Sequence, residues 1–233
     1  MSITAVLFDL DGTLLPMDND EFTKAYFKLL SANMTKYGYE PKALIDAVWA
    51  GTAAMVKNKG DKSNEAAFWE KFGEIYGEKG LNDKPLFDEF YRTDFQKLKD
   101  FCGYNEKAPE TVRSLKEKGC TVALATNPIF PAYATESRIR WAGLEPSDFA
   151  LYTTYENISY CKPNPYYYAE IFKRLGINAE ECVMVGNDAR EDMVAAKSGA
   201  KVFLLTDCLI NKENADISVY PQGGFEDLKE YLY

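Results

Sequence analysis

Near the N-terminus the chain reads Ala5-Val6-Leu7-Phe8-Asp9-Leu10-Asp11-Gly12-Thr13. The four apolar residues at the start of this stretch are typical of a buried strand, and two aspartates follow where that strand ends. Side chains two positions apart in an extended chain point to the same face, so Asp9 and Asp11 are expected to lie together. Strand-end aspartates also form ordinary turns. Because this pair directly follows an apolar strand and precedes a glycine that permits a sharp turn, we favour a functional site here.

The rest of the chain alternates between two kinds of pattern. Short apolar runs that end in polar or glycine-rich turns predict buried parallel strands at residues 5–8, 121–125, 150–153, 183–185 and 202–205. Helical patterns, each followed by a glycine, cover residues 110–118, 132–142, 166–175 and 191–198. This alternation predicts an α/β fold with a doubly wound, Rossmann-like parallel sheet. Active sites of such sheets lie at the carboxyl ends of the strands.

A long segment after the first strand shows no strand pattern. Apolar and aromatic residues recur at helical spacing in residues 22–37, 43–56, 66–76 and 86–98. This predicts an inserted α-helical cap domain of about four helices. The expected domains are therefore an α/β core catalytic domain, residues 1–16 and 101–233, and a helical cap, residues 17–100.

The composition excludes several classes of function. With 27 Lys and Arg against 36 Asp and Glu, the chain carries a formal net charge of −9, which disfavours nucleic acid and membrane surfaces as partners. The chain has no histidine, which excludes histidine bases, histidine-containing zinc sites and Ser-His or Cys-His nucleophiles. Five cysteines without a CxxC motif fit reduced thiols. We see no signal peptide or membrane span, so the expected location is cytoplasmic.

Two further polar segments follow predicted strands. Thr126 and Asn127 come after the second strand and precede Pro128, where either phosphate binding or an ordinary turn accounts for them. Lys162 lies in a segment stiffened by two prolines, just before a predicted helix. A loop lysine is usually solvated, but the restricted backbone makes a positioned cation plausible here.

More acids follow the strand predicted at residues 183–185. Asp188 and Asp192 stand four positions apart where a helix is predicted to begin, and Asn187 precedes them. Acids at a helix N-terminus serve as caps and interact favourably with the helix dipole, which is one explanation. Together with Asp9 and Asp11 at the same edge of the sheet, however, they would repel one another without a cation. An oxygen-rich set of this kind predicts a Mg²⁺ site.

Taken in this order, the four segments resemble the haloacid dehalogenase-like hydrolase superfamily, in particular its phosphatases with a helical cap inserted after the first strand. The positions that carry the resemblance are Asp9, Asp11, Thr13, Thr126, Lys162, Asp188 and Asp192. The chain departs from the family at Gly186-Asn187-Asp188, where the family often has Gly-Asp.

The resemblance implies a Mg²⁺-dependent phosphatase that acts on a small phosphorylated metabolite through an aspartyl-phosphate intermediate. Asp9 would be the nucleophile and Asp11 the acid/base. The implied metal ligands are Asp9, the Asp11 backbone carbonyl and Asp188. The implied phosphate-binding residues are Thr126, Asn127 and Lys162, with Thr13, Asn187 and Asp192 in support.

Several alternatives remain open on sequence grounds. A sugar-phosphate mutase shares all four motifs, and a phosphonatase would need a cap lysine, for which Lys57, Lys59 and Lys62 are candidates. A non-catalytic phospho-binding regulator is a third alternative. A dehalogenase has no acid/base role for Asp11, and a receiver domain lacks the helical insertion. The physiological substrate and the oligomeric state are not predicted from the sequence.

Overall fold

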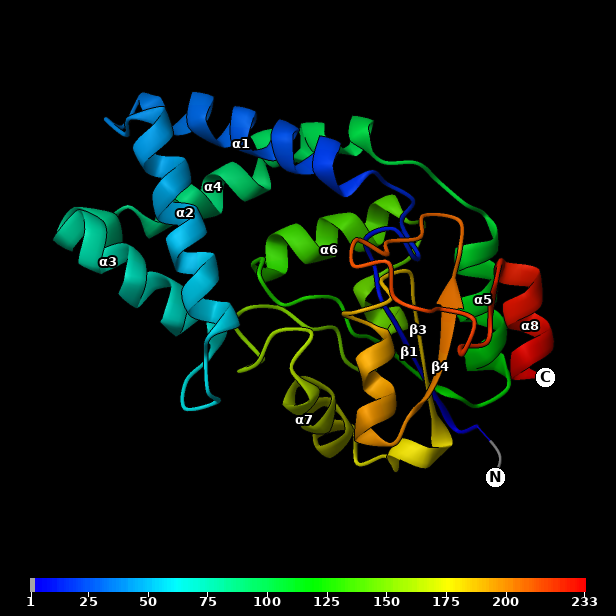
Figure 1. Cartoon of the computed structure of the whole chain (residues 1–233). Helices are drawn as coiled ribbons and strands as arrows, with labels where there is room; N and C mark the ends of the chain where they lie inside the picture. The colour runs from blue at the N-terminus through cyan, green and yellow to red at the C-terminus, as the bar shows by residue number, and fades with distance from the viewer. Residues whose placement is uncertain (1–2) are drawn as a thin grey trace.

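A parallel sheet lies at the centre of the α/β core in the computed structural model, which describes residues 3–233 (Figure 1). Its five strands lie in the order β2-β1-β3-β4-β5. They are β1 Ala5–Phe8, β2 Thr121–Leu124, β3 Cys182–Gly186, β4 Lys201–Leu205 and β5 Gln222–Gly223. All pairings between neighbouring strands are parallel, so the carboxyl ends of the strands share one edge of the sheet.

Strand β1 lies between β2 and β3. Phe8, its last residue, is in register with Leu124 of β2 and Val185 of β3. The backbone N–H of Asp9 continues the ladder by donating to Val185 O at 2.9 Å. All four residues of β1 are fully buried, as expected for a strand covered on both faces. Asp9 therefore leaves the sheet at the middle of its carboxyl edge.

Helices cover both faces of the sheet. These are α5 Lys107–Glu117, α6 Ala132–Trp141, α7 Pro165–Leu175 and α8 Phe225–Leu232, with short 3-10 segments η2 Pro146–Asp148, η3 Ala179–Glu181 and η4 Met193–Ser198. Val6 and Phe8 belong to the apolar cluster that includes residues of α5, α6 and α8. Ala5 and Leu7 belong to the cluster that includes residues of α7 and η4. Alternate residues of one strand thus pack on opposite layers, which confirms the predicted doubly wound Rossmann-like fold.

A set of helices occupies the chain between β1 and α5. They are α1 Asn19–Thr35, α2 Pro41–Val56, α3 Asn64–Asn82, α4 Lys84–Arg92 and the 3-10 segment η1 Asp94–Phe101. We call residues 19–101 the helical insertion. Asp18, Glu40 and Ser63 cap α1, α2 and α3 by accepting from backbone N–H groups of the first turn. The helix predicted over residues 86–98 is instead divided at Thr93, and the proposed domain boundaries at 16/17 and 100/101 stay a prediction.

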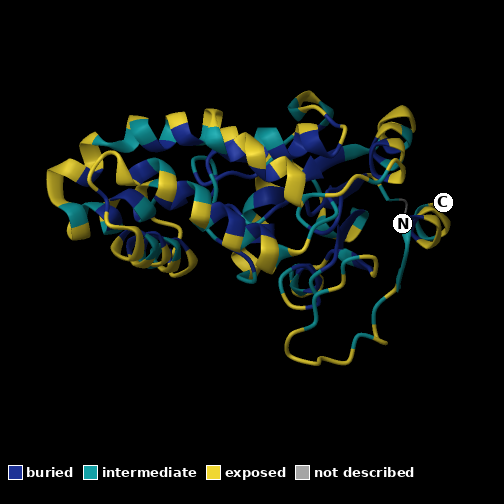
Figure 2. Cartoon of the chain, turned by 90° about the horizontal axis from the view of Figure 1, so that it is seen from above, coloured by how far each residue is buried: buried dark blue, intermediate teal, exposed yellow. Residues whose placement is uncertain are grey.

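Figure 2 shows exposed residues along the outer faces of the helices and buried residues on their inner faces. The helical insertion also contacts the α/β core at the start of α3. There the backbone N–H of Asn64 donates to Ile158 O at 3.0 Å, and that of Glu65 donates to Tyr155 O at 2.7 Å. Within residues 3–233, no helix has both the length and the apolarity that crossing a membrane requires.

Two predicted elements need correction, and one element was not predicted. Residues 150–153 form only an isolated bridge between Tyr152 and Leu124. The backbone N–H of Ala150 donates to Val122 O at 2.8 Å and that of Thr153 donates to Leu124 O at 3.0 Å, so this segment uses one more residue than β2 between the two bonds, and the ladder is irregular. The helix predicted over residues 191–198 begins at Met193 and is a 3-10 segment. Strand β5, two residues long, was not predicted because it is too short to carry a pattern.

Candidate active site

A cavity of about 270 Å³ lies where the carboxyl ends of β1, β2 and β3 meet the helical insertion. Its lining combines polar residues of the core with aromatic residues of the insertion. The predicted site residues among its lining are Asp9, Asp11, Thr126, Asn127, Asn187, Asp188 and Asp192. Thr13 and Lys162 lie behind this surface, in contact with Asp9. The structure therefore brings together all the candidate residues that the sequence indicated.

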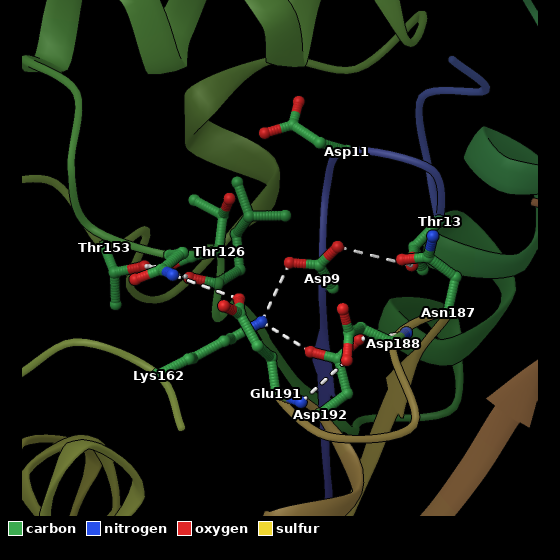
Figure 3. A network of polar contacts seen from close by, with 12 residues as sticks. Asp9, Asp11, Thr13, Thr126, Thr153, Lys162, Asn187, Asp188, Glu191 and Asp192 are labelled. Atoms are coloured by element: carbon green, nitrogen blue, oxygen red, sulfur yellow. Dashed lines mark hydrogen bonds and ion pairs between the residues drawn. The ribbon is translucent and has the colours of Figure 1, made fainter. Parts of the chain in front are cut away.

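Lys162 and Asp9 form a buried ion pair at the end of β1 (Figure 3). Lys162 Nζ lies 2.8 Å from Asp9 Oδ1 and 2.6 Å from Asp192 Oδ1. The side chains of Lys162 and Asp192 are each 1% exposed, and that of Asp9 is 11% exposed. Burial alone would lower the pKa of Lys162, but the attraction of Asp192 and Asp9 outweighs it and raises that pKa well above its usual value. Lys162 is thus a fixed cation rather than a solvated loop residue.

Asp192 is held in place from two sides. Besides accepting from Lys162, its carboxylate accepts from the Asp188 N–H at 2.9 Å through Oδ2. Burial raises the pKa of Asp192, against the opposing attraction of Lys162. A Cβ at Gly186 would lie 2.1 Å from Asp192 Oδ2, so only glycine at this strand end admits the carboxylate. Asp192 therefore supports Lys162 and the turn that begins at Asp188.

Asp188 and Glu191 occupy the same turn. Asp188 Oδ1 accepts from the backbone N–H groups of Arg190 and Glu191 at 2.8 and 2.9 Å, while its other oxygen has no partner among the described residues. Glu191 Oε2 accepts from Asn127 Nδ2 at 3.0 Å, and burial raises the pKa of Glu191 to about 7. Sequence analysis did not identify Glu191, although its position between Asp188 and Asp192 was the available signal.

Asp11 lines the cavity but faces a different partner from Asp9. Arg138 of α6 donates to Asp11 Oδ2, and its side chain is only 1% exposed. Figure 3 shows the Asp11 carboxylate apart from the cluster of Asp9, Lys162 and Asp192. Asp9 and Asp11 thus line the same cavity, but their carboxylates pair with different cations, Lys162 and Arg138.

The environment of Asp11 combines opposing effects. Burial raises its pKa, and the nearby Arg138 opposes that change. Asp11 Oδ1 is buried and has no hydrogen-bond partner among the described residues. Arg138 itself was missed by sequence analysis. The signal that could have identified it is a charged residue among the buried positions of α6, which include Ala134 and Ile139.

The remaining predicted residues fix the loops around this cluster. Thr13 Oγ1 lies 3.4 Å from Asp9 Oδ2 and 3.1 Å from Asn187 Oδ1. Asn187 Nδ2 donates to Cys208 O at 2.6 Å, so both polar ends of the Asn187 side chain bond to protein groups. The backbone carbonyl of Thr126 accepts from the hydroxyl of Thr153 at 2.6 Å and from that of Tyr167 at 2.8 Å. Through its contacts with Thr13 and Cys208, Asn187 thus joins the loops that carry these two residues.

The carboxylates around the cavity are oxygen ligands of the kind that suits a hard divalent cation. Five carboxylates line the cavity, those of Asp9, Asp11, Asp188, Glu191 and Asp192. Their cationic partners, Lys162 and Arg138, are fewer in number. Within residues 3–233, no three His, Cys, Asp or Glu side chains already converge tightly enough to hold an ion. The excess of oxygen ligands and the unpartnered oxygens of Asp11 and Asp188 nevertheless fit Mg²⁺.

A doubly wound parallel sheet with acids at the carboxyl ends of β1 and β3, and helices inserted after β1, defines an α/β enzyme. The chain belongs to the haloacid dehalogenase-like hydrolase family, whose family model matches residues 3–199. This confirms the resemblance drawn from the sequence. A curated relative, the ribulose-1,5-bisphosphate 5-phosphatase of Halopiger xanaduensis, is 27% identical over 209 residues, which cover 84% of this chain and 81% of the relative.

Solved structures share the fold. A predicted phosphoglycolate phosphatase from Haemophilus somnus superposes with a TM-score of 0.60 at 17% identity, covering 100% of this chain and 99% of that chain. The HAD phosphatase from Thermococcus onnurineus also gives 0.60, at 18% identity and coverage of 100% and 98%. A HAD-hydrolase from Bacillus subtilis, bound to magnesium, gives 0.57 at 17% identity and coverage of 100% and 99%. At these identities the likeness shows the fold.

Proposed function

We propose that this hydrolase is a Mg²⁺-dependent phosphatase that acts on a small phosphorylated metabolite through an aspartyl-phosphate on Asp9. The observation that carries the proposal is the buried pair of Lys162 and Asp9, which presents a carboxylate to the cavity at the end of β1. The curated relative that is a phosphatase supports the same reaction class.

Asp9 is the proposed nucleophile. One of its oxygens attacks phosphorus, and the bond from phosphorus to the leaving oxygen breaks, so that the phosphoryl group passes to Asp9. Lys162 and Thr13 hold the Asp9 carboxylate and limit its rotation. A fixed orientation lowers the entropic part of the barrier.

Asp11 is the proposed acid/base. In the first step it gives a proton to the leaving oxygen, and in the second it takes a proton from the water that hydrolyses the aspartyl-phosphate. Burial raises the pKa of Asp11, which favours a carboxyl that carries a proton. Oδ2 accepts from Arg138, whereas Oδ1 has no hydrogen-bond partner among the described residues, so Oδ1 is the oxygen proposed to carry the proton.

Asp9, the Asp11 backbone carbonyl and Asp188 are the proposed ligands of the metal. When bound, Mg²⁺ would offset the repulsion between the Asp9 carboxylate and a phosphate dianion. The side chains of Thr126 and Asn127, which line the cavity, would contact the transferring oxygens. Lys162, which lies behind Asp9, would add positive charge close to them. Asn187 and Asp192 support this arrangement by fixing the loops that carry it.

Hydrolysis of a phosphate ester is preferred over the other reactions of the superfamily. A phosphonatase would need a cap lysine in the cavity, but Lys57, Lys59 and Lys62 are not among the described lining residues. Lys62 instead pairs with Glu70 at 2.6 Å. A mutase shares the motifs, and no observation favours it. We also keep the proposal of a cytoplasmic protein, supported by five unpaired cysteines.

The experiment is a phosphate-release assay on a panel of small phosphate monoesters, with Mg²⁺ or with a chelator. Asp9→Asn should lower kcat/KM by about 10³ or more, because nucleophile and metal ligand are lost together. The variant should fold, since Lys162 keeps Asp192 as a partner. Asp46→Asn is the control, an exposed carboxylate that also pairs with a lysine. An Asp9→Asn protein with a tenth of wild-type turnover would refute the covalent mechanism.

A further inference from the structure

The helical insertion contributes an aromatic wall to the cavity, opposite the acids of the core. The rings of this wall include Phe22 and Tyr26 of α1, Trp49 of α2, Trp69 of α3, and Phe87 and Tyr91 of α4. Four successive helices therefore each present at least one ring to the same space. The part of the cavity beyond the phosphate site therefore has a mainly apolar surface.

The polar atoms of this wall are largely paired with one another. The hydroxyls of Tyr26 and Tyr91 are 2.9 Å apart, and Trp69 Nε1 donates to the Tyr155 hydroxyl at 3.3 Å. The insertion also adds Asn19, Thr23 and Thr52 to the lining, and the Thr52 hydroxyl donates to Val48 O at 2.9 Å. A ligand that enters the cavity therefore meets mainly ring faces and edges, with few polar side chains among them. Such a surface favours an apolar or aromatic group over a polyhydroxylated one.

The charged residues that line the cavity disfavour a substrate with a second phosphate. Among the described lining residues the only Lys or Arg is Arg138, and Asp11 already pairs with it. The other charged groups of the lining are carboxylates. A second phosphate on the substrate would therefore lie without a cationic partner, near acids that repel it.

We propose that the substrate is a phosphate monoester whose organic part is uncharged, apolar and ring-bearing, and that it carries no second phosphate. This inference rests on the proposed phosphatase function and specifies its substrate class. A cavity of about 270 Å³ holds a compact molecule of this kind. The curated relative, by its name, acts on a bisphosphate instead, so the two proteins would differ in specificity.

The test compares 2-phenylethyl phosphate, ethyl phosphate and ribulose 1,5-bisphosphate in a Mg²⁺-dependent phosphate-release assay. The first two have similar primary-alcohol leaving groups, so a difference in kcat/KM reports the added ring rather than chemical reactivity. We expect 2-phenylethyl phosphate to exceed ethyl phosphate by about tenfold or more. The bisphosphate should rank last. A first rank for the bisphosphate, or equal values for the two monoesters, would overturn the proposed substrate class.

Trp49 gives the matched variant because it lines the cavity and is 51% exposed, so its replacement should not disturb the core. Trp49→Ala should lower the ratio of kcat/KM for 2-phenylethyl phosphate to that for ethyl phosphate by about threefold or more. Val56 is 48% exposed, lies at the end of the same helix and is not among the lining residues. Val56→Ala should leave the ratio unchanged. An unchanged ratio in Trp49→Ala would show that Trp49 of the aromatic wall does not contribute to specificity.

A binding experiment separates failure of the substrate class from failure of the proposed function. The probes are 2-phenylethylphosphonate and ethylphosphonate, which are not hydrolysed, titrated while tryptophan fluorescence is recorded. Tighter binding of the phenyl compound with no turnover of any monoester would support the aromatic wall and refute the phosphatase. Turnover of the monoesters with no preference for the phenyl compound in either assay would support the phosphatase and refute the proposed substrate class.

Discussion

Arg138, which is buried, and Asp11, which is partly exposed, form an ion pair that joins helix α6 to the turn after β1. The other aspartate of the same turn, Asp9, has a separate cation in Lys162. Two acids two positions apart are thus each neutralised by a cation from elsewhere in the chain. This arrangement reduces their mutual repulsion and sets their carboxylates in different directions.

The first prediction concerns the strength of the Arg138–Asp11 pair. Arg138→Met should lower the free energy of unfolding by about 1–3 kcal/mol, because it leaves a partly buried carboxylate without its partner. The double variant with Asp11→Asn should be more stable than the sum of the single changes implies, by about 1–3 kcal/mol. Urea unfolding measures both. Arg140→Met, an exposed change on the same helix, is the control and should have little effect. Strict additivity would contradict coupling between the two residues.

The second prediction concerns Asp11 as the acid/base. Asp11→Asn should lower kcat/KM for ethyl phosphate by about 10²–10⁴, because a poor alkoxide leaving group depends on protonation. The loss for p-nitrophenyl phosphate should be smaller, since that leaving group departs without a proton. Steady-state kinetics on the two esters, at saturating Mg²⁺, provides the comparison. Losses of equal size at the chemical step would remove Asp11 from this role.

The third prediction separates the two acids after β3. Asp188→Ala should weaken the apparent affinity for Mg²⁺ more than Asp192→Ala does, because Asp188 keeps an unpartnered oxygen whereas Asp192 is committed to Lys162. Asp192→Ala should instead lower the free energy of unfolding by about 3 kcal/mol or more. Magnesium titrations and urea unfolding of both variants test this. The opposite order in the titration would make Asp192 the ligand.

The fourth prediction concerns Asn64, the fully buried first residue of α3. Its Nδ2 lies 3.3 Å from each of Pro128 O, Tyr160 O and Cys161 Sγ, in the two loops that carry Asn127 and Lys162. Asn64→Ala should lower the free energy of unfolding by about 1–3 kcal/mol, because buried acceptors lose their donor.

The same variant should also lower kcat/KM, since both loops adjoin the candidate site. Asn82→Ala, an exposed change at the other end of α3, is the matched control and should alter neither quantity. A normal kcat/KM in a destabilised Asn64→Ala protein would show that the contact holds the helical insertion without influencing the site.

Much of the fold was predictable because its signals are local. The buried run at residues 5–8 and the glycines after the core helices mark elements through neighbouring residues alone. The error at residues 150–153 has a different origin, since this apolar run does pair with β2 but has one extra residue between its hydrogen bonds. Such an irregularity depends on the register in which two segments meet, which apolar patterning does not report.

The sequence by itself determined the doubly wound sheet, the helical insertion and the gathering of Asp9, Lys162 and Asp188 at one edge, because parallel strands bring their carboxyl ends together. Only the tertiary structure decided that Arg138 pairs with Asp11 across 127 positions of sequence, and that aromatic rings of four helices face one cavity. Rings at helical spacing pack equally well in a core or around a ligand. Which of the two they do depends on the angles at which the helices meet, and those angles follow from packing across the whole molecule.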